Sequence, residues 1–147
     1  MKKFLLALAA IVAGPAIAAD TQTMTDQATQ RVISRSGGGQ VSDITQTGSG
    51  NWGETNQSGA NNTARILQQG TGNSSIVTQN GSNLSAESVQ TGGAGVRIDQ
   101  SGQTGGIRVQ QSGDGNSAVT TQSGLGHIAN VTQTGNGNIS QQTQSGR

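Results

Sequence analysis

The chain has 147 residues, 29% of them apolar, with no cysteine and a formal net charge of +1. The lack of cysteine excludes a disulfide framework and a thiolate metal site. The balanced charge argues against nucleic-acid binding and electrostatic membrane anchoring, which both need a basic surface. An ordinary globular core is not expected at this apolar content. The chain is therefore either disordered or buries polar side chains in an ordered way.

Residues 1–19 have the features of a secretory signal peptide. Two lysines at positions 2 and 3 are followed by an apolar run over 4–12 that is too short to span a membrane, and residues 16–18 (Ala-Ile-Ala) offer a small-residue cleavage site. Cleavage leaves six arginines against seven acidic residues, so the net charge falls close to −1. No later stretch is apolar enough for a transmembrane helix. The sequence predicts that the mature chain leaves the cytoplasm.

Two further segments follow the predicted signal peptide. Residues 20–40 are expected to form a flexible N-terminal leader, whose role in docking or export stays open. Residues 41–147 contain a Gln-x-Gly tripeptide at nearly constant spacing, with steps of 11 residues and a single step of 10, from Gln90 to Gln100. A short fixed period predicts stacked units that are too small to bury a face alone. The glutamines are Gln46, Gln57, Gln68, Gln79, Gln90, Gln100, Gln111, Gln122, Gln133 and Gln144.

Each block also alternates with a period of two, which is typical of a strand with one buried face. In residues 57–67, Asn62, Ala64 and Ile66 alternate with polar or charged neighbours, and the next inward residue is Gln68. The later inward positions of the other blocks are mainly small or β-branched. The first inward position holds Asn51, Asn62, Asn73, Asn116 and Asn138, and Leu84, Gly105 and His127 replace asparagine elsewhere.

The residues after each glutamine are turn formers, because glycine readily adopts the positive φ that tight turns need. The turn glycines are Gly48, Gly59, Gly70, Gly81, Gly92, Gly102, Gly113, Gly124, Gly135 and Gly146. The 10-residue step aligns only if a turn residue is deleted, since a deletion within a strand would reverse the buried face.

These patterns predict an all-β fold, a flat two-sheet β-solenoid. Each 11-residue half-repeat supplies one strand and one turn, two half-repeats make a 22-residue coil, and about five coils fit into the repetitive region. Identical Asn and Gln side chains then lie in register and hydrogen-bond along the stack, as in cross-β assemblies. Polymerised chains are expected to give cross-β structure.

One outward position carries charges of alternating sign. Asp43, Arg65, Glu87 and Arg108 occupy the middle outward position of every second block, and stacking would place them in consecutive coils of one sheet. Opposite charges on neighbouring strands attract weakly. Four charges also alternate easily by chance, so the sequence leaves both interpretations open.

The repeats resemble those of the curlin family, the subunits of curli amyloid fibres on Gram-negative cell surfaces. The curlin pattern is Ser-x5-Gln-x-Gly-x-x-Asn-x-Ala-x3-Gln; residues 111–122 (QSGDGNSAVTTQ) match its second half fully, and residues 63–79 follow it with Ser75 at the alanine position. The resemblance implies a secreted, non-enzymatic subunit that polymerises into extracellular adhesive and biofilm fibres. It also implies a companion curlin subunit, an outer-membrane secretion pore and accessory export factors.

The family has a major subunit and a minor nucleator. Repeats that stay regular to the last block favour the major subunit, whereas the missing glycine-rich leader and the absence of tyrosine argue against it. We expect the major subunit, with the nucleator as the alternative. A soluble ice-binding or ligand-binding solenoid is a more distant alternative, because no outward column is uniformly threonine. Calcium-binding β-rolls have a nine-residue period with a recurring aspartate, which this chain lacks.

Nothing in the sequence indicates an enzyme, a cofactor, a metal site or a small-molecule substrate. His127 is the only histidine and occupies a column otherwise rich in asparagine, so it is interpreted as a substituted ladder residue. The acidic residues form no catalytic pair. Trp52 at an outward position is either a contact for a neighbouring subunit or merely exposed.

The expected mechanism is self-templating. Strand edges at both ends of the stack would expose unpaired backbone groups, and terminal caps, which block such edges in soluble solenoids, are not evident in the sequence. Head-to-tail addition at such an edge gives filaments. The Asn and Gln ladders and the turn glycines are the residues expected to carry it.

Overall fold

The computed structural model describes residues 8–13, 19–25 and 30–146. All regular structure within these ranges is β-strand, and no helix in them could span a membrane. The strands are β1 (Leu8–Ala13), β2 (Ala19–Thr25), β3 (Gln30–Gly38), β4 (Val41–Ser49), β5 (Trp52–Ala60), β6 (Thr63–Thr71), β7 (Ser74–Thr91), β8 (Ala94–Ser112), β9 (Asn116–Leu125), β10 (Ile128–Thr134) and β11 (Ile139–Gly146).

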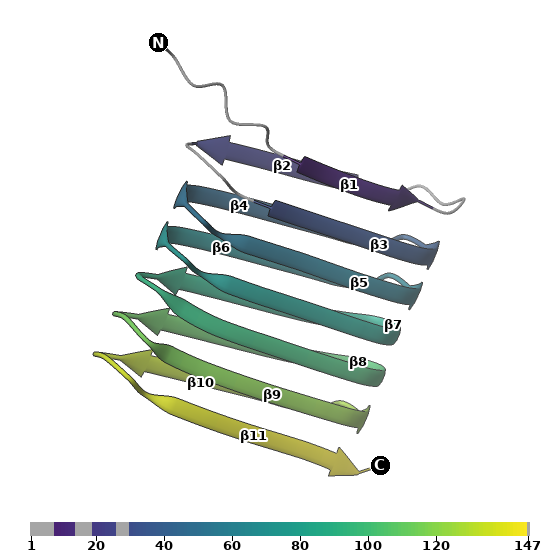
Figure 1. The fold of residues 1–147 in the computed structure, drawn as a ribbon. Helices are drawn as coiled ribbons and strands as arrows, with labels where there is room; N and C mark the ends of the chain where they lie inside the picture. The colour runs from purple at the N-terminus through teal and green to yellow at the C-terminus, as the bar shows by residue number, and fades with distance from the viewer. Residues whose placement is uncertain (1–7, 14–18, 26–29, 147) are drawn as a thin grey trace.

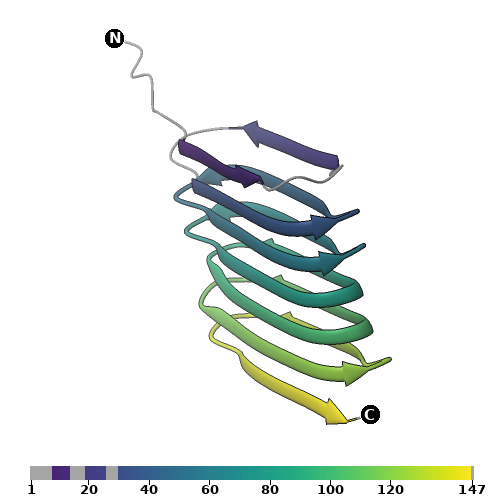
Figure 2. The same ribbon diagram turned by 90° about the vertical axis from the view of Figure 1, so that its right-hand side faces the viewer.

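The strands wind into a stack of coils, and every strand pairing is parallel (Figures 1 and 2). One face holds β2, β4, β6, the second halves of β7 and β8, and β10, in that order along the stack. The opposite face holds β1, β3, β5, the first halves of β7 and β8, β9 and β11. The predicted β-solenoid of about five 22-residue coils is confirmed.

The register repeats every 22 residues, as in the pairing of Ile44 with Ile66 and of Gln57 with Gln79. Between β7 and β8 the offset is 21, because the half-repeat from Gln90 to Gln100 is one residue short. Ala94 pairs with Asn116, so the missing residue belongs to the preceding turn. Val96 and Ile98 therefore remain inward, 4% and 0% exposed, as expected from the alternation.

The core is a thin layer between the two faces. Its apolar part is a column of small and β-branched residues, since these fit a pleated, closely packed surface; Ile44, Ile66, Val77, Ile98 and Val109 are 0% exposed. Buried amides and hydroxyls fill the rest, and Ser42 and Thr55 share a hydrogen bond of 2.7 Å across the core. Polar burial on this scale explains how the chain folds with so few apolar residues.

The turn glycines form arcs in which consecutive coils approach closely. At Gly59, φ is 106°, and an added Cβ would overlap the carbonyl oxygen of Gly81 in the next coil. The same relation joins Gly48 to Gly70 and Gly102 to Gly124. Only glycine fits, because the backbone is left-handed and the adjacent coil fills the space where a side chain would lie. Gly146 ends β11, where no further described coil stacks on it.

A second left-handed position lies two residues further along most turns. Glycine occupies it in most coils, but Asn61, Asn83 and Thr104 have φ values of 56°, 57° and 54° there. Asparagine tolerates this conformation, whereas a β-branched residue is strained in it. Thr104 is therefore the strained member of the column.

The ladder extends beyond the boundary expected at residue 41. We expected a flexible leader over 20–40, but β2 pairs with β4 and β3 pairs with β5 in the same 22-residue register. Ile33 lies in the β-branched column and is 1% exposed, and Gln40 is equally buried at the position of an asparagine. The sequence hid this coil because Arg35-Ser36-Gly37 replaces the Gln-x-Gly tripeptide. β1 lies within the predicted signal peptide, which stays a prediction.

Candidate functional site

Two rows of buried glutamines run along the stack, one on each face. On the face of β4, Gln46, Gln68, Gln90, Gln111 and Gln133 are joined by Nε2–Oε1 hydrogen bonds of 2.7, 2.8, 3.5 and 2.6 Å. On the opposite face, Gln57, Gln79, Gln100, Gln122 and Gln144 are joined at 2.9, 2.8, 3.2 and 2.7 Å. In every one of these bonds the donor lies in the N-terminal coil of the pair. The rows therefore give the stack a chemical polarity.

Most of these glutamines also bridge the two faces. The Nε2 of Gln57 donates to the carbonyl oxygen of Val41 at 2.9 Å, and that of Gln68 donates to Trp52 O at 2.9 Å. The same bond, to the residue 16 positions earlier, recurs at Gln79, Gln90, Gln122, Gln133 and Gln144. In the glutamines that also donate to the next member of their row, both N–H groups are thus used, which offsets the cost of burying them. Sequence periodicity could not reveal this second contact.

The asparagines clamp the turns. Asn51 Nδ2 donates to Thr47 O and Gly70 O, both at 3.2 Å, and Asn51 Oδ1 accepts from the backbone N and the Nδ2 of Asn73 at 3.1 Å. Asn116 and Asn138 repeat this pairing near the C-terminal end of the stack. One side chain therefore closes its own turn and holds the next coil.

The asparagines belong to two different columns. Asn51, Asn73, Asn116 and Asn138 share one column, which is interrupted by Ala94. Asn62 lies in the other column between Gln40 and Leu84, and Gly105 and His127 follow. Gln40 makes the same bonds as an asparagine, to Ser36 O and Gly59 O, and nothing in the repeat pattern indicated this role. Ala94 stands in the asparagine column after the turn that is one residue short, and there Gln90 Nε2 donates to Ala94 O at 2.7 Å.

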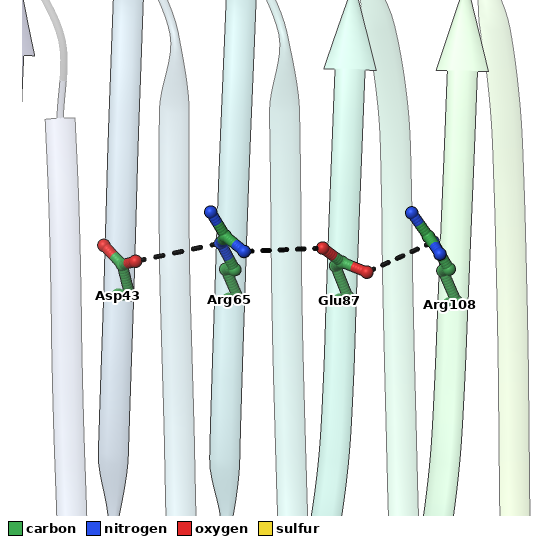
Figure 3. A network of polar contacts seen from close by, with 4 residues as sticks. All are labelled: Asp43, Arg65, Glu87 and Arg108. Atoms are coloured by element: carbon green, nitrogen blue, oxygen red, sulfur yellow. Dashed lines mark ion pairs between the residues drawn. The ribbon is translucent and has the colours of Figure 1, made fainter.

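The predicted charge row lies on the outer surface of one face. Asp43, Arg65, Glu87 and Arg108 follow one another on adjacent strands (Figure 3), with ion-pair distances of 3.8, 3.9 and 3.1 Å. The structure thus brings all four predicted residues together. Each pair is solvated and contributes up to about 1 kcal/mol. On the other face, Asp99 accepts a hydrogen bond of 2.8 Å from Arg97 and raises the pKa of the guanidinium.

The last coil is only half covered. β10 pairs only with β8 and β11 only with β9 among the described residues, so both have an unpaired edge. Asn138 and Gln144 are partly exposed, although their counterparts in the middle coils are buried. Ile128 and Ile139 are 70% and 85% exposed. An edge of this kind can accept a further parallel strand pair.

The remaining candidates form no reactive constellation in the described chain. His127 lies in the turn between β9 and β10, near Gly124 and Gly146. No cluster of potential metal ligands occurs in the part that the structure describes. Trp52 occupies the first outward position of β5, in register with Ser74 of β7. The open edge of β10 and β11 therefore offers backbone and amide groups that can hydrogen-bond to another strand.

Comparison with known proteins agrees with this arrangement. The sequence model of the curlin associated repeat matches residues 59–92 and 106–135, which fall within β5 to β7 and β8 to β10. Neither the curated proteins nor the solved structures include a significant match to the chain. The matched segments contain part of both glutamine rows, namely Gln68, Gln79, Gln90, Gln111, Gln122 and Gln133, together with most of the turn glycines. Two segments of the chain are thus similar to the curlin associated repeat, which supports membership of the curlin family.

Proposed function

We propose that this protein is the secreted major subunit of a curli-like fibre and assembles head to tail on the cell surface. The observation that carries the proposal is the pair of amide rows, which run without a break to an unpaired strand edge. An incoming copy continues both rows and both sheets with the contacts already used between coils. Such an interface does not close on itself, so it produces filaments.

The edge of the last coil supports assembly in preference to a stable monomer. Gln133 Nε2 donates to Ser117 O. Its second N–H is on the side of the open edge, which is the direction in which the preceding glutamines of the row donate to the next coil. Asn138 Oδ1 lies at the position from which Asn51 and Asn116 accept the backbone N–H of the following coil. A docked copy supplies these partners together with a full ladder of backbone hydrogen bonds. The stabilisation per added coil is therefore comparable to that within one chain.

The resemblance to curli subunits extends this proposal to partners. A companion curlin subunit nucleates the fibre, and an outer-membrane pore with accessory factors exports the chain unfolded. The fibre contributes to adhesion and to the biofilm matrix. The regular glutamine row up to Gln144 favours the major subunit, because a subunit that is added repeatedly needs matching ends.

A thioflavin-T time course on the purified secreted chain, followed by fibre diffraction, tests the proposal. We expect a lag and then growth, removal of the lag by preformed seed, and reflections near about 4.7 and 10 Å. A β-rich chain that remains monomeric for days would refute the proposal. In that case a capped solenoid that binds ice or a ligand becomes the better interpretation.

A further inference from the structure

Over the coils from β4 to β11, two outward columns carry large apolar residues at their two ends and small or polar residues between them; Ala19 of β2 and Gln30 of β3 precede these columns in register. The first column, on the face of β4, is Val41, Thr63, Ser85, Gly106 and Ile128. The second, on the opposite face, is Trp52, Ser74, Gly95, Ser117 and Ile139. Single exposed apolar residues need no explanation, but both columns place one at each end. The exposed isoleucines belong to the same unpaired edge.

Continuing the register by one coil shows what these residues would meet in a second copy. If β10 and β11 of one copy stack on β4 and β5 of another, Ile128 lies beside Val41 and Ile139 lies beside Trp52. The same step places Gln133 on Gln46, Gln144 on Gln57 and Asn138 on Asn51, so the buried rows continue. Asn130 meets Asp43 and Gln141 meets Glu54, so no like charges are opposed.

Stacking on β2 and β3 would not reproduce these matches. Asp20 and Met24 occupy the register positions of Ser42 and Gln46. On β3, Arg31 and Arg35 occupy those of Gly53 and Gln57. The counterparts Ser42, Gln46 and Gln57 are all buried, so charged residues at these inward positions of an interior coil are unfavourable. A copy docked there would interrupt both amide rows.

We infer that the docking surface for a second copy is the edge of β4 and β5, which β2 and β3 cover in the single chain. Residues Ile128 and Ile139 of one copy pack on Val41 and Trp52 of the next, and the incoming β10–β11 coil displaces β2–β3. The β2–β3 coil is thus an exchangeable cap that keeps the acceptor edge covered until another copy arrives. This inference rests on the proposed self-assembly and specifies its interface.

Cysteine cross-linking between copies reads the register directly, because the natural chain has no cysteine. Thr132 faces outward on β10, and the inferred docking places it beside Thr45 of the next copy. Docking on β2 would instead place it beside Thr23, which pairs with Thr45 in the single chain. Neighbouring strands are about 4.8 Å apart, within disulfide reach, whereas strands two steps apart are about 9.6 Å apart and beyond it.

In the experiment, full secreted chains carrying Thr45→Cys and Thr132→Cys are assembled together under reducing conditions and then oxidised. A covalent dimer from this pair, and none from Thr23→Cys with Thr132→Cys, is the expected result. Fibres that link only the second pair would overturn the inference and leave the proposed function intact. If the unmodified chain forms no fibres at all, the proposed function fails and this inference fails with it.

Apolar complementarity has its own test. The double variant Ile128→Asn, Ile139→Asn is expected to raise the soluble concentration left at equilibrium by about tenfold, since two cross-strand apolar contacts are lost. Leu125→Asn is the matched control, because Leu125 is also exposed, at the end of β9, but its column leads to Ala60 of β5 and holds no large apolar residue there. The fluorescence emission maximum of Trp52 should shift to shorter wavelength on assembly. An equal rise in soluble concentration for Leu125→Asn, or an unchanged emission maximum, would contradict the inferred contact.

Discussion

The middle coils and the C-terminal coil have the same sequence motif but different environments. Gln68 and Asn73 are 0% and 1% exposed, whereas Gln144 and Asn138 are partly exposed at the unpaired edge. In the inward apolar column Ile66 is 0% exposed, and Val131 of the last coil is 7% exposed. The comparison shows that a following coil supplies part of the burial of the amide ladders, most clearly at Asn138 and Gln144. A terminal coil is therefore incomplete until another strand pair covers it.

The same comparison separates residues that hold the single chain together from residues that join chains. A ladder residue in a middle coil has partners on both sides, so its loss weakens folding and assembly alike. A ladder residue in the last coil has half of its partners, so its loss affects mainly the docking of the next copy. Four sets of substitutions probe the turns, the amide rows and the charge row, in order of decreasing expected effect on stability.

Gly59→Ala should have the largest effect. The substitution strains a backbone at φ 106° and brings Cβ against the carbonyl oxygen of Gly81, so we expect a loss of more than about 4 kcal/mol. Gly135→Ala is the matched control, because its φ of 99° imposes the same strain but an added Cβ meets only Asn138 at 3.7 Å. Urea unfolding followed by circular dichroism compares the two. Equal midpoints would show that coil stacking does not require the glycine arc.

Gln68→Ala should follow. It removes the acceptor of Gln46 Nε2 and the donor to Gln90 Oε1, so two buried amide groups lose a partner, at about 2–4 kcal/mol in total. Gln144→Ala removes only one such row contact and should cost the single chain about 1 kcal/mol.

Elongation rates from preformed seed complete this comparison. End-coil substitutions, such as Gln46→Ala with Gln144→Ala, are expected to slow elongation more than mid-chain substitutions, once each rate is corrected for the loss of folding stability. If end-coil and mid-chain substitutions slow elongation equally, the edge-templating mechanism is contradicted.

Thr104→Gly should stabilise the chain by about 1 kcal/mol, because it relieves a β-branched residue at φ 54°. Gly126 occupies the same column in the last coil with φ 70°, so Gly126→Thr is the reciprocal control and should destabilise by a similar amount. Thermal unfolding of both variants measures these two changes in stability. A destabilising Thr104→Gly would mean that the threonine side chain makes a contact worth more than the strain.

Glu87→Gln should have the smallest effect, below about 1 kcal/mol, although it breaks pairs with both Arg65 and Arg108. Among the residues that the structure describes, Asp43 forms an ion pair only with Arg65, so Asp43→Asn should cost still less. Both effects should fade at high salt, because exposed charges are screened. Stability measured at low and high ionic strength checks this, and a salt-independent loss would assign the residues a packing role instead.

Much of this architecture could be predicted because the repeat is short and the strand period is two. The inward columns and the single turn deletion followed from spacing alone, which also aligned Asp43 to Arg108 but left open whether their alternating charges arose by chance. The role of Gln40 could not be predicted, since a glutamine there breaks the asparagine column and makes the same bonds with a longer side chain. The coil of β2 and β3 was missed for a related reason: Arg35 and Met24 stand where the repeat requires glutamine.

The sequence by itself determined which residues face inward, where each turn lies and how far apart equivalent residues are along the chain. These features depend on local backbone preferences and on a fixed period, which any single repeat already contains. Tertiary structure alone decided that most row glutamines bridge the two faces, that the amide rows point toward the C-terminal coil and that Ile128 and Ile139 lie exposed at an open edge. Those features depend on how separate coils stack, because each coil takes half of its hydrogen bonds and most of its burial from its neighbours.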